Sequence, residues 1–425
     1  MRYSTPRGTR DILPGEIEKW QHVEGRIHRI CELYGYKEIR TPMFEQTELF
    51  VRGIGEVTDI VEKEMYTFAD KANRSMTLRP EGTAPVARAF IEHKLYAEAQ
   101  PVKLYYIGPM FRYERPQAGR YRQFSQFGVE AFGSMDPMLD AEIISLAHDF
   151  YVSLGLDQIK ARINTIGCPE CRPRYQGHIK QVLSGRLDQL CRNCQQRYER
   201  NPMRILDCKN ERCSGIASEV GSIDPFLCDE CSEHFEAVKT SLDELSIPYV
   251  IDPAIVRGFD YYTKTVFEFV AEGIGAQDAI GGGGRYDGLI ESCGGPATPG
   301  VGFAAGLDRL LLAMEANGIE PAVSNRLGCF VVAPDKGSRI RSACLVSSLR
   351  RLGVSADMDY VGRSMSRQLK HASRLDARCV AILGEDELAR GVTQVRDMDR
   401  GEQWEVPLSE AASRIADFVR SVSGE

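Results

Sequence analysis

Four arginines surround one short turn of the sequence and could bind phosphate. The turn covers residues 116–119, and the arginines on its two sides are Arg112, Arg115, Arg120 and Arg122. If the flanking segments pair as a hairpin, the guanidinium groups share one surface, and each is a planar fork that can bind two phosphate oxygens. Phe124 follows and offers a ring on which a base can stack. The pattern predicts a nucleotide site, with a solvated hairpin carrying surface ion pairs as the alternative.

A second polar segment lies at residues 257–268. It places Arg257 beside the hydroxyl groups of Tyr261 and Tyr262. Such a set is suited to recognising a polar ligand. An edge strand whose tyrosines pack in the core has the same pattern, so the segment alone does not decide between the two.

Glycine-rich sequence follows at residues 279–288 and 298–309. Glycine lets the backbone approach a ligand or another strand closely. The segments match neither the Walker A loop nor the dinucleotide-binding fingerprint. A strand that passes directly into a helix would place Arg309 on the first helical turn, and this favours a phosphate site there.

Carboxylates and their neighbours form a further candidate set. Glu81 and Thr83 lie in a turn at the start of a predicted helix, and Gln126 and Glu130 are four residues apart on a predicted strand. Residues four apart on a strand point to the same face. A pocket with these side chains would suit a ligand that carries an amine and other hydrogen-bonding groups. Glu81 is equally a residue that the helix dipole favours at a helix N-terminus.

Cysteines are concentrated in one part of the chain. Of thirteen, eight lie between residues 168 and 231: Cys168, Cys171, Cys191, Cys194, Cys208, Cys213, Cys228 and Cys231. In a long chain without secretory features, paired CxxC steps are typical of metal sites, and zinc prefers four such ligands. The gap of 19 residues between Cys171 and Cys191 fits a zinc ribbon. Eight thiolates could hold two ions, the spacing leaves the ligand sets open, and a reduced insert without metal is the alternative.

Length and composition limit the class of protein. A chain of 425 residues is long enough for two or three domains. With 43% hydrophobic and 27% charged residues it is neither disordered nor fibrous. The net charge of −7 argues against bulk non-specific nucleic-acid binding but leaves room for local basic patches. The sequence has no apolar run of about 18 residues and no signal-peptide pattern at its start, so we expect a cytoplasmic protein.

The elements that must position these residues follow from periodicity. Apolar residues at three- and four-residue steps predict an amphipathic helix over 17–34, and residues 36–42 predict a strand that stops at Pro42. Further strands are expected at 65–68, 75–78, 102–107, 124–132 and 262–270, and helices at 83–96, 138–154, 231–245 and 307–316. Strands in blocks with flanking helices predict an α+β domain built on an antiparallel sheet, interrupted by a cysteine-rich insertion at 168–248.

The last hundred residues have a different pattern of predicted elements. Short apolar strands at 328–333, 355–360 and 379–383 alternate with helical patterns, which predicts βαβ units and a separate α/β domain after a linker at 315–326. Basic residues at helical spacing predict one helix face that contacts a phosphate backbone or is simply solvated. These residues are Arg363, Arg367, Lys370, Arg374 and Arg378.

Taken together, the segments resemble the histidyl-tRNA synthetases, a family of class II aminoacyl-tRNA synthetases, nearly from end to end. Residues 35–42, 111–124 and 300–309 resemble class II motifs 1, 2 and 3, and residues 257–262 and 282–287 resemble the two histidine-specific motifs. The resemblance implies a class II catalytic domain over 1–325, with 168–248 in the place of the family's insertion domain, an α/β anticodon-binding domain over 326–425, and a homodimer formed through motif 1. Cysteines in the insertion are not general to the family.

For ATP, the resemblance implies a role for each matching residue. Arg112 and Arg257 would hold the α-phosphate from opposite sides and act in catalysis. Glu114 would meet the adenine amino group and Phe124 would stack on the ring. The outer phosphates and the ring would be held by Arg120 and Arg309, and Mg²⁺ would bridge the outer phosphates.

For the amino acid, the resemblance implies that histidine is read by its α-amino group and its imidazole. The α-amino group would be held by Glu81, Gly82 and Thr83, with Gln126 nearby. The imidazole would be read by Glu130 and Tyr262, with Tyr261 and Tyr286 lining the pocket.

The implied activity is ATP-dependent ligation of L-histidine to tRNA(His) through a histidyl-adenylate. One alternative is a catalytically inactive paralogue that serves as the regulatory subunit of ATP phosphoribosyltransferase, but that paralogue lacks the anticodon-binding domain, which is present here. A second is a synthetase-like RNA-binding or sensor module, against which the intact ATP-site residues argue. Residues 257–262 and 282–287 disfavour prolyl or threonyl specificity.

Overall fold

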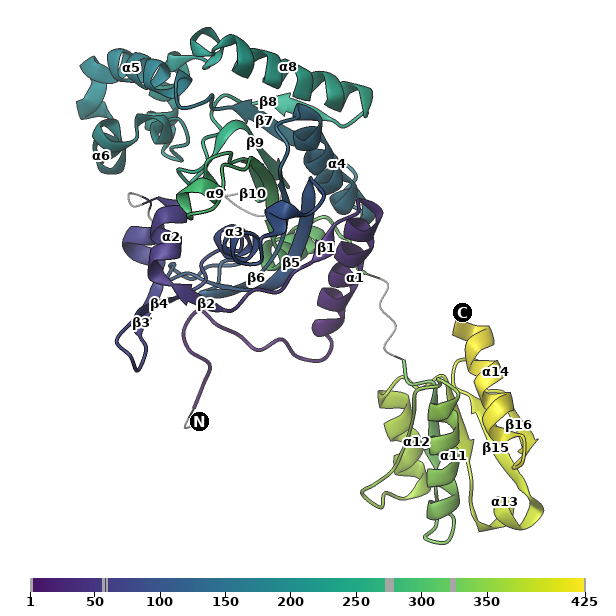
Figure 1. Ribbon diagram of the computed structural model, residues 1–425. Helices are drawn as coiled ribbons and strands as arrows, with labels where there is room; N and C mark the ends of the chain where they lie inside the picture. The colour runs from purple at the N-terminus through teal and green to yellow at the C-terminus, as the bar shows by residue number, and fades with distance from the viewer. Residues whose placement is uncertain (1–2, 56–57, 59, 272–278, 322–325, 424–425) are drawn as a thin grey trace. The chain divides into compact units, whose positions relative to one another are not determined.

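The computed structural model describes residues 3–55, 58, 60–271, 279–321 and 326–423 (Figure 1). The chain divides into two compact units, Met1–Pro321 and Ala322–Glu425. The predicted linker at 315–326 lies partly outside the described residues. None of the helices in the described part of the chain is long and apolar enough to cross a membrane.

An eight-stranded sheet forms the centre of the first unit, in the order β1-β5-β6-β11-β10-β9-β7-β8. Only the edge pairs β1–β5 and β7–β8 are parallel, so the predicted antiparallel α+β sheet is confirmed. The strands are β1 (Lys37–Glu38), β5 (Val102–Phe111), β6 (Gln123–Phe132), β7 (Ala161–Thr165), β8 (Tyr249–Ile251), β9 (Thr263–Val270), β10 (Ala279–Arg285) and β11 (Gly300–Gly306).

Helices cover one face of this sheet and form the main hydrophobic core with it. They are α1 (Ile17–Leu33), α4 (Pro137–Ser153), α8 (Asp229–Glu244) and α10 (Leu307–Ala316). Phe127 and Val129 of β6 point into this core, so alternate residues of the same strand, Gln126 and Glu130, point to the opposite face. The alternation of β6 therefore separates core residues from candidate site residues.

The apolar stripe predicted for the first helix is confirmed. Trp20, Val23 and Ile27 are buried, and the helix ends before Gly35, which has a φ of 78°. The strand expected over 36–42 is shorter than predicted, because β1 is an edge strand that pairs only with β5 before the chain leaves the sheet.

The opposite face carries the smaller elements. A three-stranded sheet has the order β2-β4-β3, and the other elements here are α2 and α3 with short helical turns. Their bounds are β2 (Phe44–Gln46), α2 (Thr47–Ile54), η1 (Ile60–Glu64), β3 (Tyr66–Ala69), β4 (Ser75–Leu78), α3 (Thr83–Glu92), η2 (Leu95–Ala97) and α9 (Leu289–Ser292).

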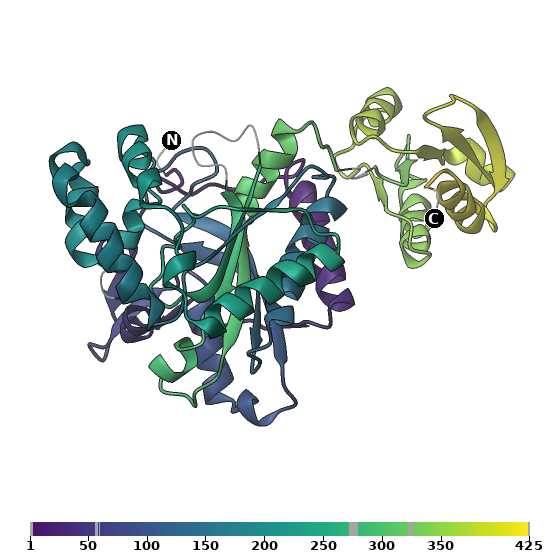
Figure 2. The same cartoon turned by 90° about the horizontal axis from the view of Figure 1, so that it is seen from above.

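The insertion is helical and lies at the side of the sheet away from α1 (Figures 1 and 2). Before α8, its elements are α5 (Cys171–Leu183), η3 (Ser184–Gln189), α6 (Arg192–Arg200), η4 (Pro202–Ile205), α7 (Glu211–Ala217), η5 (Ser218–Val220) and η6 (Asp224–Phe226). Their apolar side chains, among them Tyr175, Ile179 and Ile205, belong to the same buried cluster as residues of the site face of the sheet. The insertion is therefore packed onto the central sheet.

The second unit is an α/β domain, as predicted. Its five-stranded sheet has the order β13-β12-β14-β15-β16, with parallel pairs around β12 and antiparallel pairs from β14 onward. Its elements are β12 (Cys329–Val332), α11 (Arg339–Arg351), β13 (Ala356–Met358), α12 (Met365–Arg374), β14 (Cys379–Ile382), α13 (Glu385–Arg390), β15 (Val392–Asp397), β16 (Gln403–Pro407) and α14 (Ala411–Ser423).

The predicted basic helix face is too long. Helix α12 ends at Arg374, because Asp376 adopts a φ of 49° that stops the helix. Arg363 precedes the helix and pairs with Asp359 at 2.5 Å, and Arg378 follows it. Three exposed basic residues stay on the helix: Arg367, Lys370 and Arg374.

Candidate functional site

A cavity of about 740 Å³ lies on the face of the sheet opposite the core helices. Strands β6, β10 and β11, the loop at 112–122, the loop at 257–262 and the insertion segment at 191–210 all contribute to its wall. The predicted site residues that line it are Glu81, Thr83, Arg112, Glu114, Arg120, Phe124, Gln126, Arg257, Tyr261, Tyr262 and Arg309. Residues that are far apart in the sequence are thus brought together around one space.

At one part of this cavity the hairpin loop after β5 positions Arg112. Its Nε donates to the carbonyl of Pro80 at 2.7 Å, and its guanidinium carbon lies 5.5 Å from the centroid of the Phe124 ring. Glu114 is held by Arg120 at 3.2 Å. The arginine fork and the aromatic ring therefore adopt a fixed arrangement before any ligand binds. Arg309 lies in the first turn of α10, as predicted.

Arg257 lies in an irregular loop between β8 and β9. Its Nη1 donates to Glu268 Oε1 at 2.5 Å, and its guanidinium carbon is 5.7 Å from the Tyr262 ring centroid. Burial opposes the charge, but Tyr262 and Glu268 outweigh it and raise the pKa of Arg257. A Cβ at Gly282 would lie 2.7 Å from Arg257 Nη1, so this glycine makes room for the guanidinium. Arg257 is a fixed positive charge on the cavity wall.

Glu81 is both a helix cap and part of the cavity wall. Its carboxylate accepts from the backbone N–H of Thr83 at 2.6 Å and of Ala84 at 2.9 Å, at the start of α3. The side chain is buried, and burial raises its pKa although these two hydrogen bonds lower it. These contacts confirm the helix-start interpretation of Glu81, and the amine-binding interpretation stays a prediction. Gly82 is the N-cap of the same helix.

Glu130 lies directly behind the cavity wall on β6. It is 1% exposed and accepts hydrogen bonds from Thr83 Oγ1 at 2.7 Å and from the Tyr286 hydroxyl. Burial raises its pKa to about 8, although both hydrogen bonds act in the other direction. Gln126 lies four residues before Glu130 on the same face of β6, and its buried Oε1 has no hydrogen-bond partner among the described residues. One largely neutral carboxyl therefore lies behind this end of the cavity, and one amide oxygen on the cavity wall is available to a donor.

Three tyrosine rings lie together at this end of the cavity. The ring centroids of Tyr261 and Tyr262 are 4.6 Å apart, and that of Tyr286 is 5.5 Å from Tyr261. Tyr286 is fully buried behind Glu130, so it supports that carboxyl, whereas we expected it to line the pocket. Tyr261 and Tyr262 do line the cavity.

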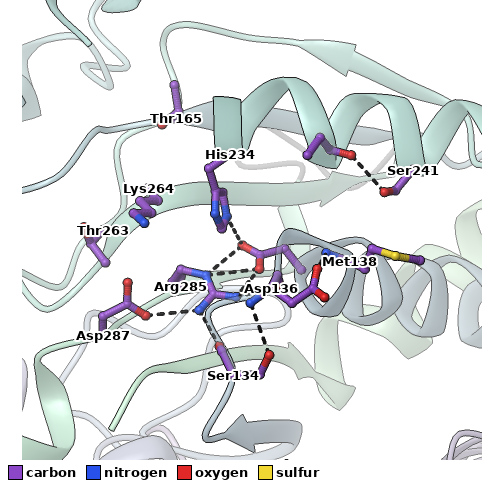
Figure 3. Close-up of polar contacts among 12 residues, drawn as sticks. Ser134, Asp136, Met138, Thr165, His234, Ser241, Thr263, Lys264, Arg285 and Asp287 are labelled. Carbon is purple, nitrogen blue, oxygen red and sulfur yellow. Dashed lines mark hydrogen bonds and ion pairs between the residues drawn. The ribbon is translucent and has the colours of Figure 1, made fainter. Parts of the chain in front are cut away.

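A buried ion pair holds the segment that carries Tyr286 (Figure 3). Arg285, at the end of β10, is fully buried and donates through Nε to both carboxylate oxygens of Asp140 on α4, at 3.1 and 3.2 Å. His234 Nε2 lies 3.3 Å from the same carboxylate. Burial would raise the pKa of Asp140, but His234 and Arg285 hold it below its usual value. The sequence analysis quoted Arg285 within a motif and gave it no role.

Other cavity residues were also missed. Tyr106 on β5 lies opposite Gly128, between Gln126 and Glu130 on the neighbouring strand. Only the register of β5 against β6 reveals this, and the sequence does not give that register. From the insertion, Asn193, Arg197, Arg204, Asp207, Lys209 and Asn210 line the cavity as well.

The eight insertion cysteines form two groups. The first cluster is Cys168, Cys171, Cys228 and Cys231, and the second cluster is Cys191, Cys194, Cys208 and Cys213. In each cluster all four sulfur atoms lie within 4.8 Å of one another, and all eight residues are free thiols. The first CxxC step pairs with the last one and not with the one that follows it, so the 19-residue gap is not that of a single zinc ribbon. The ligand chemistry suits a tetrahedral zinc ion.

Comparison with known families agrees with this geometry. A family model described as "Histidyl-tRNA synthetase" matches residues 8–168 and 224–310, and one described as "Anticodon binding domain" matches residues 329–418. The stretch between residues 168 and 224, which holds the second cluster, falls between the two matched parts of the first model.

Similar proteins span the whole chain. A "Histidine--tRNA ligase" of Desulforamulus reducens is 57% identical over 410 residues, which are 96% of this chain and 98% of the relative. One of Moorella thermoacetica is 53% identical over 422 residues, 99% of each chain. The crystal structure of apo S. aureus histidyl-tRNA synthetase has a TM-score of 0.83 at 40% identity and covers 97% of this chain and 100% of its own.

Proposed function

Because the chain belongs to the histidyl-tRNA synthetase family, we propose that it joins L-histidine to tRNA(His) at the expense of ATP, by way of a histidyl-adenylate. The observation that supports this most directly is the cavity in which Arg112, Arg257, the aromatic ring of Phe124 and the buried carboxyl of Glu81 meet. Residues 1–325 would form the catalytic domain and residues 326–425 the anticodon-binding domain.

In the first step, a carboxylate oxygen of histidine attacks the α-phosphorus of ATP. A carboxyl-oxygen-to-phosphorus bond forms, the bond from that phosphorus to the oxygen bridging the β-phosphate breaks, and pyrophosphate leaves with the electron pair. Negative charge increases on the α-phosphoryl oxygens in the transition state. Arg112 and Arg257 are already fixed on the cavity wall, so they can stabilise that charge without reorganisation.

ATP would be oriented by the hairpin side of the cavity. Phe124 would stack on the adenine, Glu114 would accept from its amino group, and Arg120 and Arg309 would hold the outer phosphates. Mg²⁺ would bind mainly to those phosphates, with Glu268 on the cavity wall as a carboxylate ligand. When bound, the ion would neutralise charge on the leaving pyrophosphate.

Histidine would occupy the tyrosine end of the cavity. Its α-amino group would donate to Glu81, Thr83 and the free oxygen of Gln126. Its imidazole would bind Glu130, behind the cavity wall, and Tyr262 on that wall. A different amino acid would leave these buried polar groups without hydrogen-bond partners, which strongly disfavours its binding. This arrangement therefore supports selection of histidine.

In the second step, a hydroxyl of the terminal tRNA ribose attacks the carbonyl carbon of the adenylate, and AMP leaves. The second unit would bind the anticodon, and exposed basic residues of α12 are available for phosphate contacts. We also expect a homodimer formed through α1 and β1, which correspond to motif 1.

Structural zinc is the remaining component of the proposal. Each four-cysteine cluster offers the soft ligand set that zinc prefers. Thiolates need a reducing compartment to persist, which agrees with action in the cytoplasm.

The proposed function is tested by histidine-dependent exchange between pyrophosphate and ATP in the presence of Mg²⁺ and the absence of tRNA. We expect exchange with histidine and with no other standard amino acid. Folded protein that shows no exchange would contradict the synthetase activity. Binding of histidine without exchange, together with capture of ATP phosphoribosyltransferase, would favour the regulatory-subunit alternative.

Glu130 gives the active site a specific pH dependence. With a pKa of about 8, its carboxyl is mostly protonated at pH 7 in the ligand-free protein. If it binds the imidazole N–H as a carboxylate, histidine binding at pH 7 must release about one proton from this group. Calorimetric titration in two buffers of different ionisation enthalpy measures that proton. We expect release by the wild type and little from Glu130→Gln, and equal values in the two proteins would contradict this role.

The same pKa shift affects stability with a defined sign. The folded pKa of about 8 lies above the ordinary glutamate value of 4.5. The stabilisation by the neutral carboxyl is therefore complete below about pH 4.5 and is lost as the pH rises from there through 8. Glu130→Gln stays neutral, so we expect it to unfold at a higher temperature than wild type at pH 9. At pH 5 the two melting temperatures should be similar.

A further inference from the structure

The loop at 257–262, which carries Arg257, Tyr261 and Tyr262, has no regular secondary structure of its own. It joins β8 to β9, and a backbone hydrogen bond from Asp260 to Ile54 at 3.1 Å connects it to α2. Groups outside the loop must therefore fix its position. Several of them belong to the insertion, and they lie next to the eight cysteines.

The first cluster contacts the end of this loop and the start of β9. Arg172, which follows Cys171, donates through Nη2 to the carbonyl of Tyr262. The carbonyl of Gly167, which precedes Cys168, accepts from Thr263 Oγ1 at 3.2 Å.

The other half of the first cluster contacts the same strand. Glu230, which precedes Cys231, accepts from Lys264 Nζ at 2.6 Å, and the same lysine donates its backbone N–H to Gly167 at 3.0 Å. His234, one turn further along α8, contacts Asp140, and Figure 3 shows this contact. Both halves of the first cluster are thus connected to the strand that continues the loop.

The second cluster contacts the middle of the loop. The segment between Cys194 and Cys208 carries Asn201, whose Nδ2 donates to Asp260 Oδ1 at 3.2 Å. It also carries Arg204, whose Nη1 donates to the carbonyl of Gly258 at 3.4 Å. The two clusters therefore hold different parts of one loop.

The geometry of both clusters fits a bound ion. In tetrahedral zinc–thiolate sites with bonds of about 2.3 Å, neighbouring sulfur atoms are about 3.8 Å apart. The Cys168–Cys171 and Cys191–Cys208 sulfur distances are 3.5 and 3.9 Å. Backbone N–H groups of Cys228 and Cys191 point at the sulfurs of Cys171 and Cys213, each at 3.1 Å. Such hydrogen bonds stabilise thiolates.

One glycine is needed to bring the first cluster together. Gly167 has a φ of 65°, and a Cβ at this position would lie 2.6 Å from the Cβ of Cys171. The chain thus turns tightly into the first CxxC step while its carbonyl still bonds to β9. Helix α5 begins at Cys171, and Cys191 and Cys228 are the N-cap residues of α6 and α8. The positive end of a helix favours a thiolate.

We propose that each four-cysteine cluster binds one zinc ion and that the two ions together hold the 257–262 loop in its catalytic position. The effect of the loop position on catalysis rests on the proposed synthetase function. The assignment of the two metal sites does not rest on that function. Without the ions, four neighbouring thiols have no strong attraction for one another. Arg172, Asn201 and Arg204 would then lose the fixed frame from which they contact the loop.

The first experiment measures metal in purified full-length protein by mass spectrometry. We expect two zinc ions per chain in the wild type and one in each double variant, Cys171→Ser/Cys231→Ser and Cys194→Ser/Cys213→Ser. Cys344→Ser is the matched control, because Cys344 is exposed in the second unit, and it should retain both ions. Wild-type protein with no zinc, with iron in its place or with a single ion would overturn the metal assignment.

The second experiment measures the kinetics of histidine-dependent ATP–pyrophosphate exchange. Loss of either ion should raise KM for histidine and lower kcat by about tenfold or more, since small misplacements of reacting groups have effects of this size. Added zinc should restore both constants in chelator-treated wild type. Zinc-depleted protein with unchanged constants would overturn the role of the ions in positioning the loop.

Variants that keep the metal complete the test if the cysteine variants do not fold. Arg172→Met and Asn201→Ala should each retain two zinc ions and still shift KM and kcat in the same direction, by about threefold or more. Arg174→Ala, an exposed arginine on the same helix, is the control and should change neither constant. Unchanged kinetics in Arg172→Met and Asn201→Ala would contradict the positioning role. A zinc-loaded wild type without exchange would instead contradict the proposed function and leave the metal sites intact.

Discussion

Arg257→Ala is expected to lower the kcat of histidine-dependent ATP–pyrophosphate exchange by about 10²-fold or more, while ATP binding changes little. The side chain is fixed by Glu268 and by the ring of Tyr262, so its charge is in place before the transition state forms. Other arginines on the cavity wall can still bind the phosphates in the ground state. Exchange kinetics and equilibrium binding of ATP measure the two quantities separately.

The conservative replacement separates charge from geometry. Arg257→Lys keeps a positive charge but loses the planar fork, so its kcat should fall between those of the wild type and the alanine variant. Exchange within about threefold of wild type in Arg257→Ala would contradict a role in transition-state stabilisation. An equal loss of ATP affinity would indicate a ground-state role instead.

Arg285→Met is expected to lower the free energy of unfolding of the first unit by about 3–5 kcal/mol. The substitution leaves Asp140 as a buried carboxylate without the guanidinium that it contacts through both oxygens. Urea unfolding followed by Trp20 fluorescence measures the effect. Trp20 is buried in the first unit. The second tryptophan of the chain, Trp404, is replaced by phenylalanine both in the reference protein and in its variants, so that only Trp20 reports the unfolding.

A double variant tests the cause of that loss. In Arg285→Met/Asp140→Leu both charges are absent, and replacing a buried ion pair with apolar side chains is often close to neutral. Most of the stability should therefore return. A single Arg285→Met variant that loses less than about 1 kcal/mol would show that water or His234 satisfies Asp140 without the arginine.

Sequence patterns predicted those elements whose residues follow a clear period. The apolar stripe of α1, the strand β4 and the helix α10 appear close to where periodicity places them. The bounds of strands β10 and β11 were not predicted, because half of their residues are glycine, which has low strand propensity. Their pairing instead needs glycine, since a Cβ at Gly283 would overlap the carbonyl of Gly302.

The residues of the candidate site could be identified from their types. The contacts among them depend on segments that are far apart in the sequence. The arginines, the carboxylates and Phe124 were recognisable from type, spacing and motif, and their roles on ATP and histidine stay predictions. The ion pair of Arg257 with Glu268 depends on where an irregular loop meets β9. The cysteine pairing depends on how the insertion folds back on itself. Neither relation has a signal in local sequence.

The strand order of the central sheet also determines when β6 can complete its pairing during synthesis. β6 pairs on one side with β5, its neighbour in sequence, but its other edge pairs with β11, from Gly300↔Phe132 to Gly306↔Gln126. At about 5–20 residues per second, a ribosome needs roughly 10–30 s to make the intervening chain. During that interval the newly made β5–β6 hairpin has one unpaired edge, which is a template for aggregation. A nascent chain at this stage is therefore the form of the protein with the greatest need for a chaperone.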